Sequence, residues 1–165
     1  TNDFSKWGQF PLIYFLILMF IGGCAGSTAC GIKIFRVQIL YQFISNQLKR
    51  IIYPRGIFNI KYDKNNVDEK FMASIISFIF LYILIFFVIT ALLSVDGLDF
   101  VTAISAAATS ISNVGPGLGD IIGPDGNFFY LSNFSKWILS IGMILGRLEL
   151  FAVLVLFIPS FWRKY

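Results

Sequence analysis

The sequence predicts an all-α integral membrane protein whose second half consists of a helix, a re-entrant loop and another helix. Three observations lead to this fold class. Of the 165 residues, 57% are hydrophobic and 13% are charged, compared with ~45–50% and ~25% in soluble domains. Residues 71–95 and 134–159 form apolar stretches long enough to cross a bilayer. Between them, a helix-forming segment runs into a stretch rich in glycine and proline at residues 113–119.

This central segment, residues 99–119, reads DFVTAISAAATSISNVGPGLG. Its small and apolar first part favours a helix that ends near Ser112, because Pro116 and three glycines cannot continue one. Twelve helical residues extend about 18 Å and the following residues return about as far, each roughly half of a ~30 Å hydrocarbon core. We therefore expect a re-entrant loop. The alternative is an ordinary Gly-Pro surface turn.

A re-entrant loop of this composition offers one chemical resource, its backbone. Non-helical backbone persists at membrane depth only where it is buried in protein or lines a watery cavity. Residues 113–119 carry no charged side chain, which leaves a column of carbonyl oxygens that can replace the hydration shell of a monovalent cation. The preceding helix would point its partially negative C-terminus at the same place.

The first apolar stretch, residues 10–43, would measure about 50 Å as one straight helix, which is too long for the bilayer core. It is interrupted by Gly22–Gly31, where every side chain is small. This run is either a close-packing helix face or a helix that unwinds within the membrane. Unwinding is favoured because each glycine costs about 1 kcal/mol of helix propensity. Ser27 and Thr28 could then bond to freed backbone groups.

The distribution of charge predicts how a multi-pass chain is oriented in its membrane. Eight of the thirteen basic residues lie between Lys33 and Lys70, which places that segment in the cytoplasm. Residues 71–95 then emerge outside, where Asp96 or Asp99 can cap the short helix that follows. The net charge of +4 thus reflects membrane topology, and no nucleic-acid partner is expected. Cys24 and Cys30 lie in an apolar run and are expected to be reduced.

Arg147 stands in the middle of the last apolar stretch, where a charged side chain is costly and normally faces protein or water. Glu149 is not its natural partner, because positions i and i+2 diverge on a helix. The carbonyls of an unwound Gly22–Gly31 segment are candidate acceptors. Arg147 is then either a barrier to permeating cations or a structural residue held by a carboxylate of a neighbouring helix.

A short internal repeat suggests a recurring unit. Phe4-Ser5-Lys6-Trp7 recurs as Phe134-Ser135-Lys136-Trp137, each time immediately before an apolar stretch. If the repeat is real, the chain is built from a span, a re-entrant loop and a span, repeated around a shared axis.

Three motifs together resemble the membrane subunit of Trk-type potassium uptake systems, within the Trk/Ktr/HKT cation transporter superfamily. They are IGGCAGSTACGIK at residues 21–33, SNVGPGLG at 112–119 and GRLELFAVLVLFIPSFWR at 146–163. The resemblance implies a C-terminal portion of a fourfold pseudo-repeat of helix, pore loop and helix. Residues 1–44 would be the inner helix of the third repeat with its glycine-rich intramembrane loop, and residues 45–70 a cytoplasmic connection. Residues 71–165 would be the complete fourth repeat: outer helix 71–95, pore helix 99–112, filter 113–119 and inner helix 134–159.

The same resemblance implies the functional residues and partners. Potassium would bind filter carbonyls at Asn113, Val114 and Gly115, followed by Pro116 and Gly117. A gate would consist of Arg147 and the loop residues Gly22, Gly23, Gly26, Ser27, Thr28 and Gly31. No cofactor is implied beyond the permeating K⁺. The implied partners are membrane lipid, a TrkA-like cytoplasmic nucleotide-binding regulatory subunit and a second copy in a homodimer. Two departures from the family are Cys30, where glycine is common and a stiffer loop is expected, and the absence of three of the four filter segments.

Two other functions are alternatives to potassium uptake. One is a sodium-permeable or sodium-coupled transporter of the same superfamily. The other is a membrane enzyme that uses Asp96 and Asp99 with a divalent metal. The sequence contains no histidine and no activated nucleophile or further convergent carboxylates, so we expect no enzyme.

Overall fold

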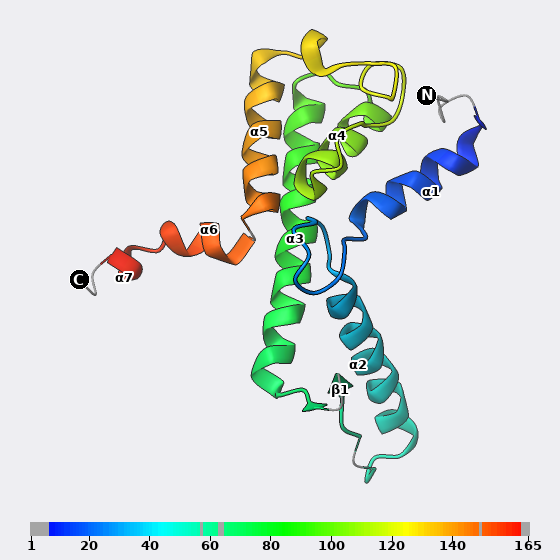
Figure 1. Ribbon diagram of the computed structural model, residues 1–165, viewed down its shortest axis with the longest axis vertical. Coiled ribbons are helices and arrows are strands. Elements are labelled where there is room, and N and C mark those ends of the chain that lie inside the picture. Colours follow the sequence, from blue (N-terminus) through cyan, green and yellow to red (C-terminus); the bar gives the residue numbers. More distant parts are fainter. Residues whose placement is uncertain (1–6, 57, 63–64, 149, 163–165) are drawn as a thin grey trace.

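The computed structural model describes residues 7–56, 58–62, 65–148 and 150–162, and this part of the chain is predominantly helical. Figure 1 shows the arrangement of its elements. The helices are α1 (Gln9–Phe20), α2 (Ile34–Ile52), α3 (Glu69–Val95), α4 (Phe100–Ser112), the short 3-10 helix η2 (Phe128–Tyr130), α5 (Asn133–Arg147), α6 (Leu150–Leu156) and α7 (Pro159–Trp162). Between α2 and α3, strands β1 (Lys61–Tyr62) and β2 (Asn65–Asn66) form one antiparallel pair, with Lys61 opposite Asn66.

The long helix α3 is the element against which the others pack. It has 27 residues and therefore extends about 40 Å. It carries no charged residue from Phe71 to Val95. Among the described helices it alone is long and apolar enough to cross a membrane, and α5 with α6 forms a second such span if the two are counted as one broken helix. Figure 1 shows α4 and α5 beside one half of α3 and α2 beside the other half.

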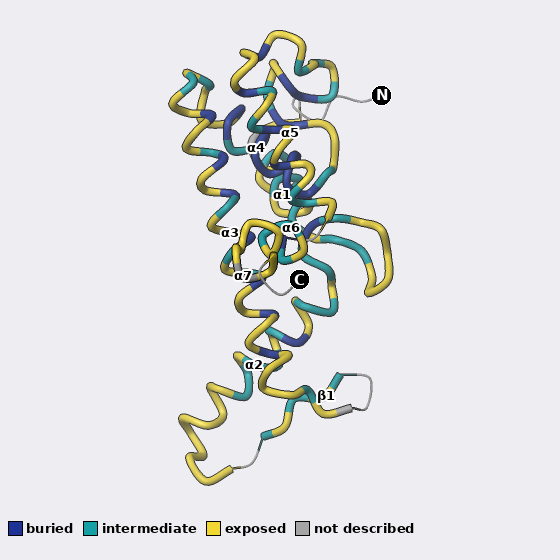
Figure 2. Tube along the Cα trace, turned by 90° about the vertical axis from the view of Figure 1, so that its left-hand side faces the viewer, coloured by how far each residue is buried: buried dark blue, intermediate teal, exposed yellow. Residues whose placement is uncertain are grey.

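Three clusters of buried side chains follow α3 along its length. The first joins Phe86, Ile89 and Leu93 of α3 to the alanines of α4. The second brings Phe78 and Tyr82 of α3 together with Ile111 and Leu150. The third packs Ile39 of α2 against Met72 and Ile75. Figure 2 shows the burial concentrated around α4, whereas the far end of α2 is exposed. Within a bilayer, such contacts stabilise the packed helices mainly through close van der Waals packing.

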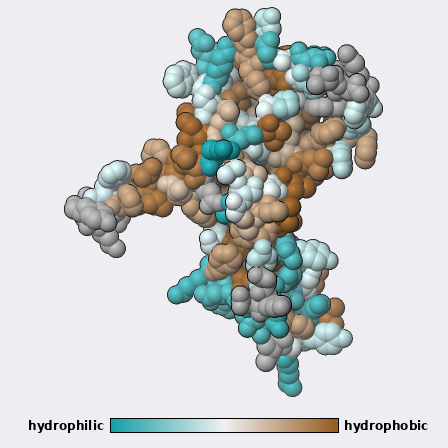
Figure 3. All heavy atoms as spheres, in the orientation of Figure 1, coloured by the Kyte–Doolittle hydropathy of each residue, from teal (hydrophilic) through white to brown (hydrophobic). Residues whose placement is uncertain are grey.

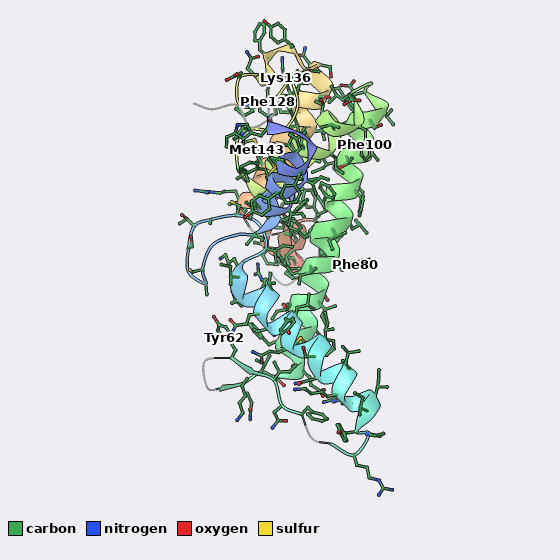
Figure 4. The ribbon with its side chains drawn as sticks, turned by 90° about the vertical axis from the view of Figure 1, so that its right-hand side faces the viewer. Tyr62, Phe80, Phe100, Phe128, Lys136 and Met143 are labelled. Atoms are coloured by element: carbon green, nitrogen blue, oxygen red, sulfur yellow. The ribbon has the colours of Figure 1, made fainter. Side chains whose placement is uncertain are left out.

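Many large apolar side chains lie on the outside of this bundle. Phe80 and Phe100 are 64% and 70% exposed, and Figure 4 shows both pointing away from the neighbouring helices. Such a surface would be unstable in water, but it is the normal outer face of a helix in a bilayer.

The structure contains the short helix predicted before the glycine-rich and proline-rich stretch, as α4, whereas its re-entrant position in a membrane stays a prediction. It begins after Asp99, whose side chain accepts a hydrogen bond from the Val101 amide (3.2 Å), as an N-cap does. It ends at Asn113, which adopts the left-handed conformation with φ 53°, a conformation that asparagine tolerates better than most residues. Residues 113–127 then return without helix or strand to the end of the bundle at which α4 began (Figure 1).

Two predicted helices are divided in the structure. The inner helix expected at 134–159 is a helix to Arg147, a second helix from Leu150 to Leu156, and a third from Pro159. The division lies where the Arg147 side chain reaches a carbonyl of the glycine-rich loop. The first apolar stretch is also divided, with α1 ending at Phe20 and α2 beginning at Ile34. The unwinding of Gly22–Gly31 is thereby confirmed, and α2 continues to Ile52, beyond the expected boundary at residue 44.

Candidate functional site: the loop after α4 and the glycine-rich loop

At the start of the loop after α4, from residue 113 to 117, every backbone amide donates a hydrogen bond to the protein. Pro116 has no amide hydrogen, and each of the other four residues from 113 to 117 uses its own. The bonds run from Asn113 to Ser110 O (3.2 Å), from Val114 to Thr109 O (3.1 Å), from Gly115 to Thr109 Oγ1 (2.9 Å) and from Gly117 to Ile122 O (2.7 Å). The donor side of this backbone is therefore turned toward the protein and fixed there.

The acceptor side of the same backbone is unused. Within the described part of the chain, no hydrogen bond reaches the carbonyl oxygens of residues 113–116. Val114, Gly115 and Pro116 are exposed, and Asn113 is partly so. Gly115 has φ +117°, in a region that only glycine adopts readily. At membrane depth, carbonyl oxygens without partners require a polar ligand such as water or a cation.

Helix α5 approaches the end of α4 closely at two glycines that the sequence analysis did not single out. A Cβ on Gly146 would collide with the carbonyl of Ile111 at the end of α4, and a Cβ on Gly142 would lie 2.9 Å from Ser110 Oγ. The spacing Gly142-x₃-Gly146 is a recognised signal for close helix packing in membranes. It could have predicted this contact.

Asn113 uses that close approach to bind α5 directly. Its side-chain Nδ2 donates to the carbonyl of Met143 at 3.0 Å. Figure 4 shows Met143 and Lys136 on α5, beside the loop after α4. A second anchor that the sequence did not reveal is the 2.6 Å hydrogen bond between Tyr82 of α3 and Ser112. Both helices of the repeat thus hold the point at which α4 ends.

The glycine-rich loop between α1 and α2 is closed at its neck. Gly22 N–H donates to Ile32 O, and Ile32 N–H donates to Phe20 O, both at 2.9 Å. A Cβ on Gly22 would lie 2.6 Å from Cys30 O, and Gly31 has φ +85°, so glycine is required at both positions. Ser27 supplies one of the expected side-chain bonds, since its Oγ accepts from the Ala29 amide at 3.1 Å.

Arg147 joins α5 to this loop, as the sequence predicted. Its Nη1 donates to the carbonyl of Thr28 at 3.2 Å and lies 3.8 Å from Cys30 Sγ. With these residues and Tyr82, Arg147 lines a cavity of about 90 Å³. No described carboxylate forms an ion pair with Arg147, and Glu149 lies outside the described residues. The predicted acceptor is confirmed, whereas a role of this contact in gating stays a prediction.

The two acidic residues considered for metal chemistry have structural partners instead. Asp96, at the C-terminal end of α3, accepts hydrogen bonds from Ser132 Oγ and from Ser135 Oγ (2.6 Å). These bonds, that from Ser132 first, hold the pKa of Asp96 below its usual value. Asp99 caps α4. Among the described residues, no group of three His, Cys, Asp or Glu side chains could hold a metal ion.

The internal repeat cannot be compared in three dimensions, because Phe4, Ser5 and Lys6 lie outside the described residues. The second copy occupies the first turns of α5. There Ser132 caps the helix by accepting from the Ser135 amide at 3.0 Å, and Lys136 Nζ donates to Phe129 O at 2.7 Å.

Comparison with known proteins places this geometry in a family. The family model described as "TrkH: Cation transport protein" matches residues 1–164. The Trk system potassium uptake protein TrkI of Halomonas elongata is 43% identical over 99% of this chain, and TrkH of Escherichia coli K12 is 35% identical over the same share. The crystal structure of the potassium transporter TrkH from Vibrio parahaemolyticus superimposes with a TM-score of 0.87 and 34% identity over 98% of this chain.

The chain spans about a third of the length of these relatives, 33% of each curated protein and 34% of the crystallised one. Its described part contains the long helix α3, the short helix α4 with the loop after it, and α5, preceded by α1 and α2 with the glycine-rich break between them. Its fold matches that of an all-α membrane transporter. The family that it matches consists of transporters and not of enzymes. By sequence and by structure, the chain belongs to the Trk family of potassium uptake transporters.

Proposed function

We propose that this chain forms part of a potassium uptake pathway across the cytoplasmic membrane, in which carbonyl oxygens of Asn113, Val114 and Gly115 coordinate K⁺. The observation that carries this proposal is the asymmetry of the loop backbone. The amides of Asn113, Val114 and Gly115 are hydrogen-bonded to the protein, while the carbonyls of residues 113–116 have no partner within the described residues. Rings of such carbonyls replace the hydration shell of K⁺ in selectivity filters.

Two further features favour a cation at this place. Helix α4 ends at the loop, so the partially negative end of its dipole points there. Pro116 and Gly117 then turn the chain away, and a Cβ on Gly117 would overlap the side chain of Ile122. Since the chain covers about a third of its relatives, the remaining filter segments would come from the rest of the protein.

The gate of this pathway is proposed to be the glycine-rich loop together with Arg147. The loop residues involved are Gly22, Gly23, Gly26, Ser27, Thr28 and Gly31. Its closed neck gives it a defined shape, and the bond from Arg147 to Thr28 O ties it to α5. A guanidinium in the pathway would repel K⁺. Opening would require the Arg147 bond to break and the loop to move aside.

Two partners are proposed with this function. Relatives of this chain are named as parts of Trk systems. A TrkA-like nucleotide-binding subunit would bind the cytoplasmic side, and two copies of the whole protein would form a homodimer. Co-purification from membranes and the mass of the intact complex in detergent would test both.

The filter assignment can be tested with two matched glycine substitutions in the full-length protein. Gly115 and Gly97 both have positive φ, and at both a Cβ would meet nothing within 4 Å. Gly115→Asp should abolish potassium-dependent growth of a transport-deficient strain, because it strains the filter backbone and adds a carboxylate there. Gly97→Asp should strain the backbone after α3 to a similar degree, but it should preserve growth because position 97 lies outside the filter. Equal growth of the two variants would remove the filter assignment.

The ion and the gate can be tested in liposomes. Parallel measurement of K⁺ and Na⁺ flux distinguishes potassium uptake from a sodium-permeable transporter with the same loop architecture. Arg147→Gln should raise the flux measured without any regulatory subunit, because it removes the fixed charge. Arg55→Gln, an exposed position after α2, is the control. An unchanged flux in Arg147→Gln liposomes would contradict the gating role.

A further inference from the structure

A second cavity lies near the beginning of α3, at the end of this helix away from α4. It has a volume of about 420 Å³ and is enclosed by α2, by the connection that contains β1 and β2, and by the first turns of α3. Phe43, Met72 and Ile76 form an apolar wall, while Arg50 and Glu69 contribute opposite charges to its lining. Figure 3 shows hydrophilic side chains gathered at this end of the molecule.

Among the described residues, the two charges have no partner of opposite charge. Within the described residues, neither the Arg50 guanidinium nor the Glu69 carboxylate forms an ion pair or a side-chain hydrogen bond. Asn46, Gln47 and Asn59 also line the cavity. The lining thus contains a cation, an anion and several amide groups, which are the groups that a zwitterionic ligand needs.

The cavity lies at the depth of lipid headgroups. About twenty helical residues cross the ~30 Å hydrocarbon core, and α3 carries no charge between Phe71 and Val95. Glu69 and Lys70 therefore sit at the membrane surface, and Met72 to Ile76 descend from it toward the acyl chains. The polar side of the cavity faces headgroups and its apolar side faces the lipid interior.

We propose that this cavity is a binding site for a phospholipid with a primary ammonium headgroup, of the phosphatidylethanolamine class. The lipid phosphate binds Arg50, the ammonium binds Glu69, and one acyl chain lies along Met72, Ala73 and Ile76. A purely anionic lipid matches the lining less well, because Glu69 would repel it. Bound in this way, the lipid joins the end of α2 to the beginning of α3.

The test uses the full-length protein in nanodiscs that contain equal amounts of phosphatidylethanolamine, phosphatidylglycerol and phosphatidylcholine. Native mass spectrometry after mild delipidation counts the lipids that stay bound. The wild type should retain phosphatidylethanolamine preferentially, and Arg50→Gln should lower this retention about tenfold through loss of a charge-assisted contact. Glu69→Gln should shift the preference toward phosphatidylglycerol, because the repulsion of an anionic headgroup is removed.

Each variant has a matched control nearby. Arg55 carries the same charge as Arg50, and Asp68 the same charge as Glu69; both are exposed and neither lines the cavity. The variants Arg55→Gln and Asp68→Asn should therefore retain lipid as the wild type does. Ala73→Trp, which fills the apolar side, should lower retention of all three lipids. The proposal would be overturned if the variants and their controls lost equal amounts of bound lipid, or if the wild type showed no preference among the three lipids. Undiminished lipid binding in Ala73→Trp would also overturn it.

Discussion

Replacing Gly146 by alanine tests whether the contact between α5 and the end of α4 sets the geometry of the filter. Gly146 is helical, so alanine is compatible with its backbone. The new methyl group would, however, overlap the carbonyl of Ile111 and lie 3.0 Å from Asn113 Nδ2. A carbonyl at the end of α4 cannot rotate aside, and α5 must therefore move away from α4.

The size of the effect follows from three contributions. Alanine gains about 1 kcal/mol over glycine in a helix. Overpacking against the backbone costs about 1–3 kcal/mol, and loss of the bond from Asn113 to Met143 costs about 1 kcal/mol more. The net destabilisation is therefore about 1–3 kcal/mol. Gly142→Ala is the matched comparison, because its methyl would meet the ends of the Ser110 and Ile89 side chains, which can rotate, and its net effect should be close to zero.

The assay compares the two variants in the full-length protein. Thermal stability in detergent, followed by the loss of the monodisperse peak on size-exclusion chromatography, should fall for Gly146→Ala and change little for Gly142→Ala. Potassium uptake should follow the same order. If Gly146→Ala is as stable and as active as the wild type, close packing of α5 against the end of α4 does not constrain the filter.

Three further results are expected. Thr109→Val removes the hydroxyl that accepts from the Gly115 amide at 2.9 Å; it should reduce the ratio of K⁺ to Na⁺ flux about tenfold, whereas Thr109→Ser should preserve it. Because hydrogen bonds lower the pKa of Asp96, its charged form stabilises the fold above the ordinary value of 3.8, and this contribution is lost as the pH falls through the lowered pKa. The stability difference between wild type and Asp96→Asn should therefore be largest at neutral pH and vanish in strong acid, and a pH-independent difference would contradict the assignment. The effects of Asn113→Gly and Arg147→Gln on flux should be non-additive; glycine at position 113 keeps the left-handed backbone. Strictly additive effects in the double variant would show that the filter and the gate are not coupled.

The features that the sequence predicted correctly depend on short-range rules. Asp96 and Asp99 were both predicted as possible caps of the short helix, and the structure shows that Asp99 is the cap. Pro116 with its neighbouring glycines predicted the end of this helix near Ser112, because capping and the backbone limits of proline act within a few residues. The unwinding of Gly22–Gly31 followed in the same way from the helix propensity of glycine. Arg147 was correctly matched to the carbonyls of this loop because an intramembrane guanidinium must find acceptors.

The features that were missed depend on contacts between distant segments. Residues 134–159 read as one apolar helix, and the sequence does not reveal that α5 ends at Arg147, where this residue contacts Thr28, 119 residues away. The bonds from Asn113 to Met143 and from Tyr82 to Ser112 each join residues 30 positions apart. No local pattern encodes such a pair. The Gly142-x₃-Gly146 spacing was the exception, since it identifies a packing face even though it does not identify the partner.

One peptide group of α5 connects the two loops. The carbonyl of Met143 accepts from the Asn113 side chain at the start of the proposed filter. In a regular helix the same carbonyl accepts from the amide four residues later, and that residue is Arg147, whose guanidinium holds Thr28 of the glycine-rich loop. A movement of the loop that pulled on Arg147 would therefore strain the last turn of α5 at the very carbonyl that positions Asn113. Since α5 cannot shift toward α4 without a collision at Gly146, such strain would be transmitted to the filter rather than absorbed by sliding of the helix.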